Sequence, residues 1–326
     1  MRCDIIIPVW NQLQLTKDCI EHIIKNTRHP YKLVIIDNGS ERQTEEYLKG
    51  IDRDSRLQVT LIRNEKNLGY VKAVNQGLRA SDADYVCLLN NDTKVGEQWL
   101  EELIKVAESD AKIGIVNPGG SLGSFKKKEL SGKWIEIGFA TGFCMLIKRE
   151  VVSKIGFFDE IYEIGFWEDT DYCKKAKKVG YICASAKAAY VYHYSHKSFN
   201  IFRKNKVNEL FEKNKNIFYS KWGRILRIAC VIFEKDINNK LTNKISKFVR
   251  EGHMVYLFFK SSAKIKDHFE QIYIRKFKYP DIFFSWCVAI KILHRRKKKF
   301  DNILTDNSKF ARKMQSLAPN LKIGII

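Results

Sequence analysis

Short apolar runs alternate with amphipathic stretches over the first part of this 326-residue chain, and this alternation constrains the fold more than any other feature. Strand patterns lie at residues 4–9, 32–36, 59–63 and 85–89, and helix patterns lie at residues 13–26, 43–51, 71–81 and 98–108. Strands that are separated by helices along the chain favour a parallel sheet covered by helices. The sequence therefore predicts an α/β fold, whose ligands bind beyond the carboxyl ends of the strands.

Polar or turn-forming residues accompany the ends of all four strand patterns. They are Pro8, Trp10 and Asn11, then residues 37–40, 67–69 and 90–93. The last group, Asn90-Asn91-Asp92-Thr93, ends an apolar strand with a carboxylate that can hold a divalent cation against a diphosphate. Asn and Asp are also common in ordinary turns, so this run alone does not identify a site. Four strand ends of this kind point to one shared site.

Three further segments complete the first part of the chain. Residues 117–133 are rich in Gly, Ser and Lys, and we expect a mobile loop or lid that can close over a ligand. Residues 138–147 predict an apolar strand with a glycine break. Residues 169–179 have helical spacing, which puts an acidic cluster at a helix N-terminus, where the helix dipole favours negative charge.

The composition changes after residue 200. Of the net charge of +21, most lies in residues 200–326, which hold 29 Lys and Arg against 10 Asp and Glu. A basic helix is predicted at residues 202–222, followed by strand patterns at 225–233, 254–259, 300–304 and 321–326 and helix patterns at 238–251 and 308–317. We expect two domains, 1–222 and 223–326. The second would be a smaller Rossmann-like α/β domain, incomplete or completed by a partner, because the sequence stops on an apolar strand.

Composition also limits location and partners. The longest apolar runs are too short, or too interrupted by charge, to span a bilayer, and the N-terminus lacks a leader pattern. The eight cysteines form no CxxC pair, which suits a reducing cytoplasm. The basic run at residues 294–299 lacks the aromatic and glycine-rich modules of nucleic-acid binding, so no nucleic acid is expected. An anionic membrane attracts such a run, which favours peripheral contact at the inner face of the plasma membrane over a merely solvated loop.

Seven blocks in order, IIIPVWNQ, VIIDNGS, NLGYVKAVNQG, CLLNNDT, ATGFCMLIKRE, FWEDTDYCKKAKKVGY and YHYSHKS, resemble the motif set of family 2 inverting glycosyltransferases. The resemblance covers residues 1–222 and is greatest to bacterial rhamnosyltransferase-like enzymes. It implies the GT-A fold, a Rossmann-like mixed sheet, and transfer of a sugar from a UDP- or dTDP-sugar, with dTDP-rhamnose as the first candidate. The acceptor would be a saccharide or lipid-linked saccharide in bacterial surface polysaccharide synthesis.

The resemblance also assigns donor-binding residues. The nucleotide pocket would be lined by Pro8, Trp10 and Asn11, and Asp37 would accept the base N–H of uracil or thymine. The diphosphate would meet Asn67, Gly69, Lys72, Asn75, Asn90 and Asn91. Two of these residues keep a structural alternative: residues 37–40 also fit a turn with a helix cap, and Lys72 also fits a solvated helix position.

The metal site is implied by the same resemblance. Asn90-Asn91-Asp92 stands where the family has its DxD motif, so Asp92 alone among the three gives charged coordination. His193 matches a late histidine that completes the site, an arrangement that suits Mn²⁺ better than Mg²⁺. His196 is the rival ligand, and a structural surface histidine is the alternative for His193.

Catalysis needs a base that deprotonates the acceptor hydroxyl. Asp169 matches the family base, with Glu168 as the second candidate. Trp167, Thr141 and Gly142 would flank the acceptor sugar, although Trp167 also fits a core position. A helix N-terminus lowers the pKa of Asp169, whereas desolvation and Glu168 raise it, so the net direction stays open.

The second part resembles, more faintly, the N-terminal half of a GT-B glycosyltransferase. Its first loop, residues 234–239, lacks glycine-rich phosphate contacts, so we expect it to be non-catalytic. The alternative for the whole chain is a non-catalytic sugar-nucleotide or glycan-binding module of a larger assembly enzyme, suggested by Asn90 and by the second domain.

Overall fold

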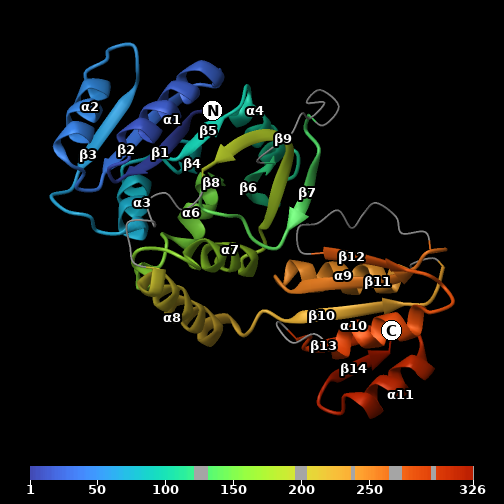
Figure 1. Cartoon of the computed structure of the whole chain (residues 1–326). Coiled ribbons are helices and arrows are strands. Elements are labelled where there is room, and N and C mark those ends of the chain that lie inside the picture. Colours follow the sequence, from blue (N-terminus) through green and yellow to red (C-terminus); the bar gives the residue numbers. More distant parts are fainter. Residues whose placement is uncertain (121–130, 195–203, 236–238, 264–273, 295–298, 326) are drawn as a thin grey trace. The chain divides into compact units, whose positions relative to one another are not determined.

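The computed structural model describes residues 1–120, 131–194, 204–235, 239–263, 274–294 and 299–325. Contacts within the chain divide it into two compact units, Met1–Trp222 and Gly223–Ile326. Each unit has its own central sheet with helices packed against it (Figure 1).

The first half of the first unit is the predicted parallel α/β arrangement. Its strands are β1 (Cys3–Val9), β2 (Tyr31–Asp37), β3 (Val59–Arg63) and β4 (Tyr85–Leu89), which lie in the order β3-β2-β1-β4 and are all parallel. They alternate with helices α1 (Leu13–Asn26), α2 (Arg42–Asp52) and α3 (Tyr70–Arg79), and α4 (Trp99–Glu108) follows β4. The expected elements are therefore confirmed, with ends that differ by a few residues.

The second half of this unit makes the sheet mixed, as the resemblance implied. Beyond β4 lie β8 (Cys144–Lys148), β6 (Ile113–Gly120), β9 (Ile182–His193) and β5 (Thr93–Val95), and β7 (Trp134–Ile137) also pairs with β9. The pairs β4–β8, β6–β8, β5–β9 and β7–β9 are antiparallel, whereas β6 and β9 are parallel. The remaining elements are α6 (Arg149–Ile155), the short 3₁₀ turn η1 (Glu160–Tyr162), α7 (Glu168–Lys178) and α8 (Lys204–Trp222).

The core of the first unit lies on both faces of the central strands. On one face, alternate β1 residues such as Ile5 join α1 and α4 in a single apolar cluster. On the other face, Ile6 packs so closely on α3 that a Cβ at Gly77 would lie 2.4 Å from its Cγ2. Burial on both faces explains why β1 is an almost unbroken apolar run. Because β1 to β4 are parallel, their carboxyl ends lie at the same edge of this buried sheet.

Two loop expectations need correction. Strand β6 continues to Gly120, so residues 117–120 are strand and not loop, and residues 121–130 lie outside the described part. The strand expected at 138–147 begins only at Cys144. Residues 138–143 form a loop because the buried Asn117 side chain donates to the Thr141 carbonyl at 3.0 Å and accepts from the Thr141 N–H at 2.6 Å. This loop carries Thr141 and Gly142 into the site.

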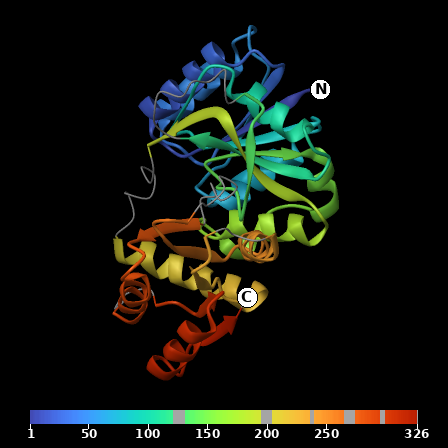
Figure 2. The same ribbon diagram turned by 90° about the vertical axis from the view of Figure 1, so that its right-hand side faces the viewer.

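The second unit has a five-stranded parallel sheet among its described residues, in the order β12-β11-β10-β13-β14. The strands are β10 (Arg227–Ile232), β11 (Met254–Lys260), β12 (Ile274–Tyr279), β13 (Asn302–Thr305) and β14 (Lys322–Ile325). The helices are α9 (Asn239–Arg250), α10 (Phe284–Leu293) and α11 (Ser308–Leu317). Figure 2 shows these elements from a second side. Strand β12 and helix α10 were not predicted, since residues 260–299 show no clear period.

In the described part of the chain, no helix combines the length and the apolar character that crossing a membrane requires.

Candidate active site

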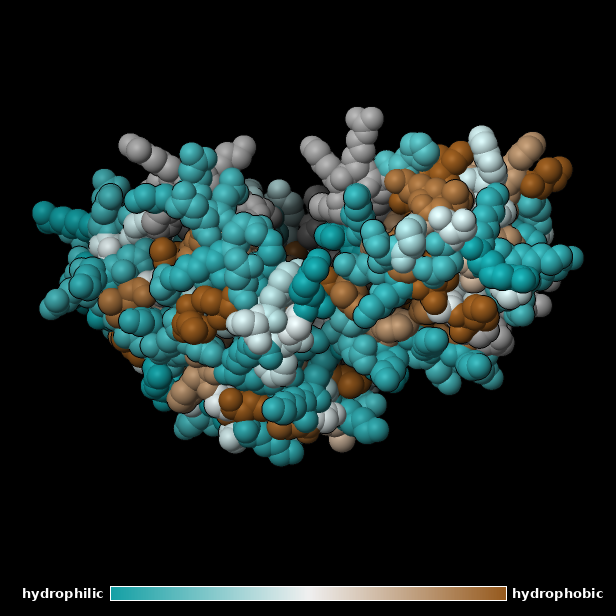
Figure 3. Space-filling view, turned by 90° about the horizontal axis from the view of Figure 1, so that it is seen from below, coloured by the Kyte–Doolittle hydropathy of each residue, from teal (hydrophilic) through white to brown (hydrophobic). Residues whose placement is uncertain are grey.

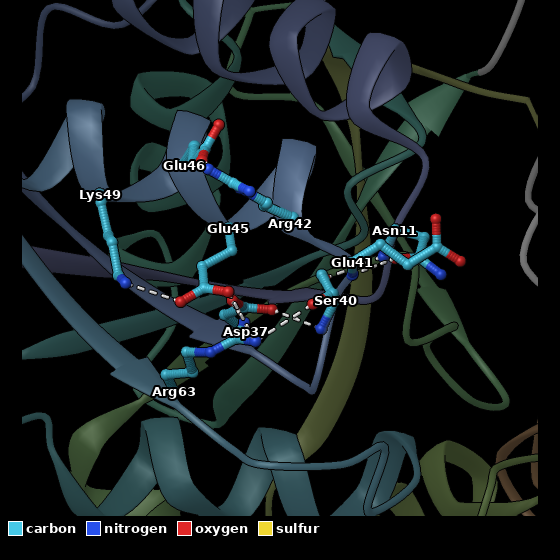
Figure 4. Close-up of polar contacts among 9 residues, drawn as sticks. All are labelled: Asn11, Asp37, Ser40, Glu41, Arg42, Glu45, Glu46, Lys49 and Arg63. Atoms are coloured by element: carbon cyan, nitrogen blue, oxygen red, sulfur yellow. Dashed lines mark hydrogen bonds and ion pairs between the residues drawn. The ribbon is translucent and has the colours of Figure 1, made fainter.

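The turn after β2 is built around the buried carboxylate of Asp37 (Figure 4). One carboxylate oxygen accepts the Ser40 N–H at 2.9 Å, and the other pairs with Arg63 at the end of β3. Arg63 also meets Glu45 of α2 at 2.9 Å and donates to the Ser40 carbonyl at 3.2 Å. Asp37 therefore caps its own turn, as the structural alternative anticipated, and is held by a cation that sequence reasoning missed.

The turns after β1 and β2 are tied together. The Asn11 N–H donates to Ser40 Oγ at 2.9 Å, and the Asn11 side-chain oxygen accepts the Glu41 N–H at 2.7 Å (Figure 4). Asn11 has a left-handed backbone, φ 56°, which Asn tolerates better than most residues. Pro8 and Trp10 are half-buried at the carboxyl end of β1. These contacts bring the residues expected around the nucleobase together at one edge of the sheet.

Amide side chains order the turn that leads into α3. Asn67 accepts from the Asn38 side chain at 2.9 Å and from the Gly69 N–H at 2.8 Å, while Asn38 accepts the Leu68 N–H at 3.0 Å. Gly69 has φ 89°, and a Cβ there would lie 3.0 Å from the Glu163 carbonyl. Glycine is therefore required at this position.

Helix α3 separates two residues that were expected to act together. Lys72 is exposed on its first turn, where its ammonium can reach an anionic ligand. Asn75 is buried, and its amide donates to the Phe158 carbonyl at 2.9 Å and accepts the Phe158 N–H at 3.0 Å. In the structure Asn75 holds the segment before η1 against α3. Its side-chain amide and oxygen both bond to the Phe158 backbone, so the described contacts give it a structural role.

Asp92 and His193 meet at the end of β4. Strand β5 pairs with β9 so that Thr93 lies opposite His193, and the Tyr194 N–H donates to the Asp92 carbonyl at 3.0 Å. This register brings His193 Nε2 to 3.0 Å from Asp92 Oδ1. Phe143 stacks on the His193 ring, with centroids 4.8 Å apart and planes at 8°. The two residues predicted as metal ligands therefore lie in contact, although 100 residues of sequence separate them.

The surroundings of this pair fit a divalent cation. Asn90 Nδ2 lies 3.4 Å from His193 Nε2, and Asn90 Oδ1 is buried without a hydrogen-bond partner among the described residues. A carboxylate, an imidazole and an orphaned amide oxygen are suitable donors for Mn²⁺. Asn91 points elsewhere, because its amide donates to Thr16 Oγ1 of α1 at 3.0 Å. Among the described residues, no group of three His, Cys, Asp or Glu side chains is arranged so that it could hold a metal ion, and His196 lies outside the described part.

Asp169 is oriented by hydrogen bonds at the start of α7. One carboxylate oxygen accepts the Gly142 N–H at 3.1 Å, and the other accepts the Thr170 N–H at 2.6 Å and its hydroxyl at 3.1 Å. Burial raises the pKa of Asp169, and these hydrogen bonds oppose the rise without cancelling it. The carboxylate is therefore both fixed in direction and more basic than usual.

Tyr70 supports this arrangement and was not predicted as a site residue. Its hydroxyl donates to the Gly142 carbonyl at 2.9 Å, and a Cβ at Gly142 would lie 3.2 Å from that hydroxyl. Burial and then the charges of Glu168, Asp169 and Asp92 raise the pKa of Tyr70. The first turn of α3 thus lies within electrostatic reach of both the metal pair and the candidate base.

Glu168 is buried beside Asp169. Burial, followed by the Asp169 charge, raises the pKa of Glu168 well above its usual value. Its Oε2 is buried and has no hydrogen-bond partner in the described part of the chain. A strongly raised pKa keeps Glu168 protonated over a wider pH range and suits it poorly as a base, which leaves Asp169 as the better candidate.

Of the residues expected to contact the acceptor, Gly142 touches the Asp169 carboxylate. Thr141 is exposed and Gly142 is buried next to Asp169. Trp167 is half-buried, and its ring packs on the aromatic side chains of α8, 5.0 Å from Phe218 and 5.7 Å from Phe211. Phe166 and Trp167 both have positive φ, 71° and 74°, a backbone strain that is typical of functional sites.

Three residues of the site had no sequence signal of their own. Asn38 lies in a quoted motif but reads as a turn residue, Arg63 reads as the solvated end of a strand, and Tyr70 reads as a helix residue. Each of them contacts a residue 26 or more positions away: Arg63 contacts Asp37, Asn38 contacts Asn64 and Tyr70 contacts Gly142. Only the folded chain reveals them.

Comparison with known proteins agrees with this geometry. Residues 4–156 match the model of "Glycosyl transferase family 2". An uncharacterized protein of Sinorhizobium fredii is 26% identical over 222 residues, which cover 58% of this chain and 24% of that protein. Glycosyltransferase GlyG of Streptococcus pneumoniae is 28% identical over 115 residues, covering 35% of this chain and 38% of the relative. The chain thus spans well under half the length of these relatives.

Two solved structures share the fold. A mannosyltransferase of Pyrobaculum calidifontis, in complex with GDP-Man and Mn²⁺, has a TM-score of 0.51 and 18% identity over 65% of this chain and 63% of its own. GalNAc-T7, with UDP, GalNAc and Mn²⁺, has a TM-score of 0.52 and 16% identity over 59% of this chain and 44% of its own. The fold of the first unit is that of GT-A glycosyltransferases. The match to glycosyl transferase family 2 and the shared GT-A fold both lie within this unit.

Proposed function

We propose that this protein is a metal-dependent, inverting glycosyltransferase that moves a sugar from a nucleotide diphosphate donor to a saccharide hydroxyl. The proposal depends on the Asp92–His193 pair at one strand end and on the oriented carboxylate of Asp169, with Tyr70 within electrostatic range of both carboxylates. A leaving-group site and a base are the two parts that direct displacement at a sugar carbon requires.

The donor would bind across the ends of β1, β2 and β4. Asp37 would accept the base N–H of uracil or thymine, with Arg63 and Ser40 fixing its direction. Pro8, Trp10 and Asn11 would line the pocket, and Asn67, Gly69 and Lys72 would face the diphosphate. UDP or dTDP is the proposed nucleotide, and rhamnose is the first sugar to test.

Asp92 and His193 would hold the divalent cation, with the Asn90 amide oxygen as a further ligand. When bound, such an ion acts as a Lewis acid that stabilises charge on the departing diphosphate. Mn²⁺ is proposed over Mg²⁺ because of the imidazole ligand. The Mn²⁺ in the two structures of similar fold supports this choice.

Asp169 would take the proton of the acceptor hydroxyl as that oxygen attacks the sugar from the face opposite the leaving group, which inverts the anomeric centre. Its raised pKa brings it nearer to the operating pH, where a general base is most effective. The Gly142 N–H and Thr170 aim the carboxylate, and the exposed part of Trp167 and Thr141 would contact the acceptor sugar.

The proposed acceptor is a saccharide, either free or lipid-linked, in bacterial surface polysaccharide synthesis at the cytoplasmic face of the plasma membrane. A chondroitin synthase of Escherichia coli, 27% identical over 119 residues that cover 35% of this chain and 17% of that protein, supports a saccharide acceptor. The second unit is proposed to be non-catalytic, because every residue assigned to the reaction lies in the first unit.

The test measures nucleotide release from a panel of UDP-, dTDP- and GDP-sugars with Mn²⁺ and oligosaccharide acceptors. Asp169→Asn should lower kcat by at least about a hundredfold. Its donor affinity, read from thermal shifts with nucleotide and Mn²⁺, should stay unchanged. Asp52→Asn, an exposed carboxylate of α2, is the matched control. Nucleotide binding without turnover by any donor would instead show a binding module.

A further inference from the structure

Helix α10 of the second unit has two apolar faces. Phe284, Val288 and Ile292 are buried and pack into the core of this unit against β11 and β12. The opposite side is also apolar: Ile282 is 88% exposed, Phe283 63% and Trp286 65%, followed by the partly exposed Ile290 and Leu293. An amphipathic helix would carry polar residues at these positions.

The exposed residues within α10 lie on one side of the helix. At 100° per residue, Trp286, Ile290 and Leu293 fall within about a sixth of the circumference, and Ile282 and Phe283 stand in the turn that leads into the helix. The arc lies opposite the residues that enter the core. Figure 3 shows that apolar patches (brown) interrupt a largely hydrophilic surface on the face drawn there. The patch formed by residues 282, 283, 286, 290 and 293 is called the α10 face below.

The unit that carries the α10 face is strongly basic. Residues 223–326 contain 23 Lys and Arg against 8 Asp and Glu, a net charge of +15. Between Ile274 and Leu293 four basic residues oppose one acidic residue, Asp281, whose carboxylate already accepts from Ser262. Arg275, Lys276 and Lys278 are exposed on β12, the edge strand. The basic run that follows α10 continues through residues 295–298, which lie outside the described part.

We propose that the α10 face docks the protein on an anionic lipid bilayer. A helix with exposed Trp, Phe and Ile beside basic residues lies in the plane of the interface, with its apolar side at the headgroup boundary. The positive charge of the unit attracts anionic headgroups and repels a second copy of this chain, which argues against a homodimer as the occupant. The inference rests on the proposed function only in that a lipid-linked acceptor lies at the same surface.

The test measures binding of the full chain to phosphatidylcholine vesicles with and without phosphatidylglycerol, by co-sedimentation. We expect binding only to the anionic vesicles, weakened by salt. The double variant Ile282→Ser/Trp286→Ser should bind them at least about tenfold more weakly, because two apolar side chains no longer enter the interface. The control is Ile161→Ser/Val179→Ser, which removes apolar side chains of 50% and 45% exposure from the first unit and should bind as the native chain does.

Three results would overturn the proposal: no binding to anionic vesicles, unchanged binding by the α10 double variant, or self-association of the native chain that this variant abolishes. Sugar transfer to a soluble acceptor separates this proposal from the proposed reaction. The α10 variant should keep that activity, whereas Asp169→Asn should lose it and still bind vesicles. Circular dichroism confirms that each variant is folded.

Discussion

At the scale of single residues, the candidate base depends on a contact made through the backbone. Tyr70 donates to the Gly142 carbonyl and the N–H of the same glycine donates to Asp169, so the hydroxyl positions the carboxylate without touching it. Tyr70→Phe should lower kcat about fivefold with little change in the donor KM, since one hydrogen bond contributes about 1 kcal/mol. Steady-state kinetics checks this, with Tyr47→Phe on α2 as the matched control. A rise in donor KM at constant kcat would place Tyr70 in the donor pocket instead.

The two neighbouring carboxylates make activity and stability depend on pH in opposite ways. The pKa of Asp169 is raised, so kcat/KM should fall on acidification at a higher pH than for an ordinary aspartate. The pKa of Glu168 is also raised, mainly by burial, so its protonated form stabilises the fold and this contribution is lost as the pH rises through its folded pKa. Glu168→Gln should therefore raise the Tm at neutral pH by a few degrees and not at pH about 4. An equal shift at both pH values would contradict the buried acid.

Metal dependence should respond to the Asp92–His193 pair. Asp92→Asn removes the charged ligand, so half-maximal activity should need at least about tenfold more Mn²⁺, and chelation should abolish native activity reversibly. Asp52→Asn, an exposed carboxylate of α2, controls for the loss of one negative charge. Activity that survives chelation in the native chain would exclude a required cation.

At the scale of elements, the two sheets differ in what the sequence reveals. Strands β1 to β4 were predicted because alternating periods and turn residues mark them locally. The position of His193 beside Asp92 follows from the register of β5 on β9, which no local pattern encodes, and only the resemblance supplied it. Helix α10 was missed because its own buried and exposed positions are both apolar, so the sequence shows no alternation of apolar and polar residues with the helical period. Arg63 and Tyr70 were missed because their roles depend on partners in other elements.

The second sheet is joined at its centre by one carboxylate. Asp306 follows β13 and accepts the N–H groups of Phe233 at 2.9 Å and Glu234 at 2.8 Å, just after β10. In doubly wound sheets the amides after this strand lie where a nucleotide phosphate binds. Here the Asp306 carboxylate accepts these N–H groups in place of a phosphate. Asp306→Ala should destabilise the second unit by about 1–3 kcal/mol, because two N–H groups lose their acceptor. Urea unfolding measures this, and Glu234→Ala, which removes a neighbouring carboxylate but no such bond, should have little effect.

At the scale of the whole molecule, the residues assigned to sugar transfer all lie before Gly223, but helix α8 belongs with them. The buried Asn214 amide donates to the Tyr162 and Gly165 carbonyls at 2.9 and 2.7 Å, and Trp222 donates to Asp171 at 2.6 Å. Lys221 adds ion pairs to Asp159 and Asp171 at 2.9 and 2.8 Å. These contacts fix the segment that enters α7 and therefore the direction of Asp169.

A cut after Trp222 should consequently preserve metal-dependent nucleotide binding and transfer to a soluble acceptor, whereas a cut before α8 should abolish transfer. Loss of α8 removes the Lys221 and Trp222 partners of Asp171 and exposes the ring of Trp167. The strained turn at residues 166–167 then loses its support. Thermal shift with nucleotide and Mn²⁺, together with transfer assays, compares the two truncations with the full chain. Full activity of the fragment cut before α8 would show that α8 does not position the base. Loss of activity in the fragment cut after Trp222 would assign part of the site to the second unit.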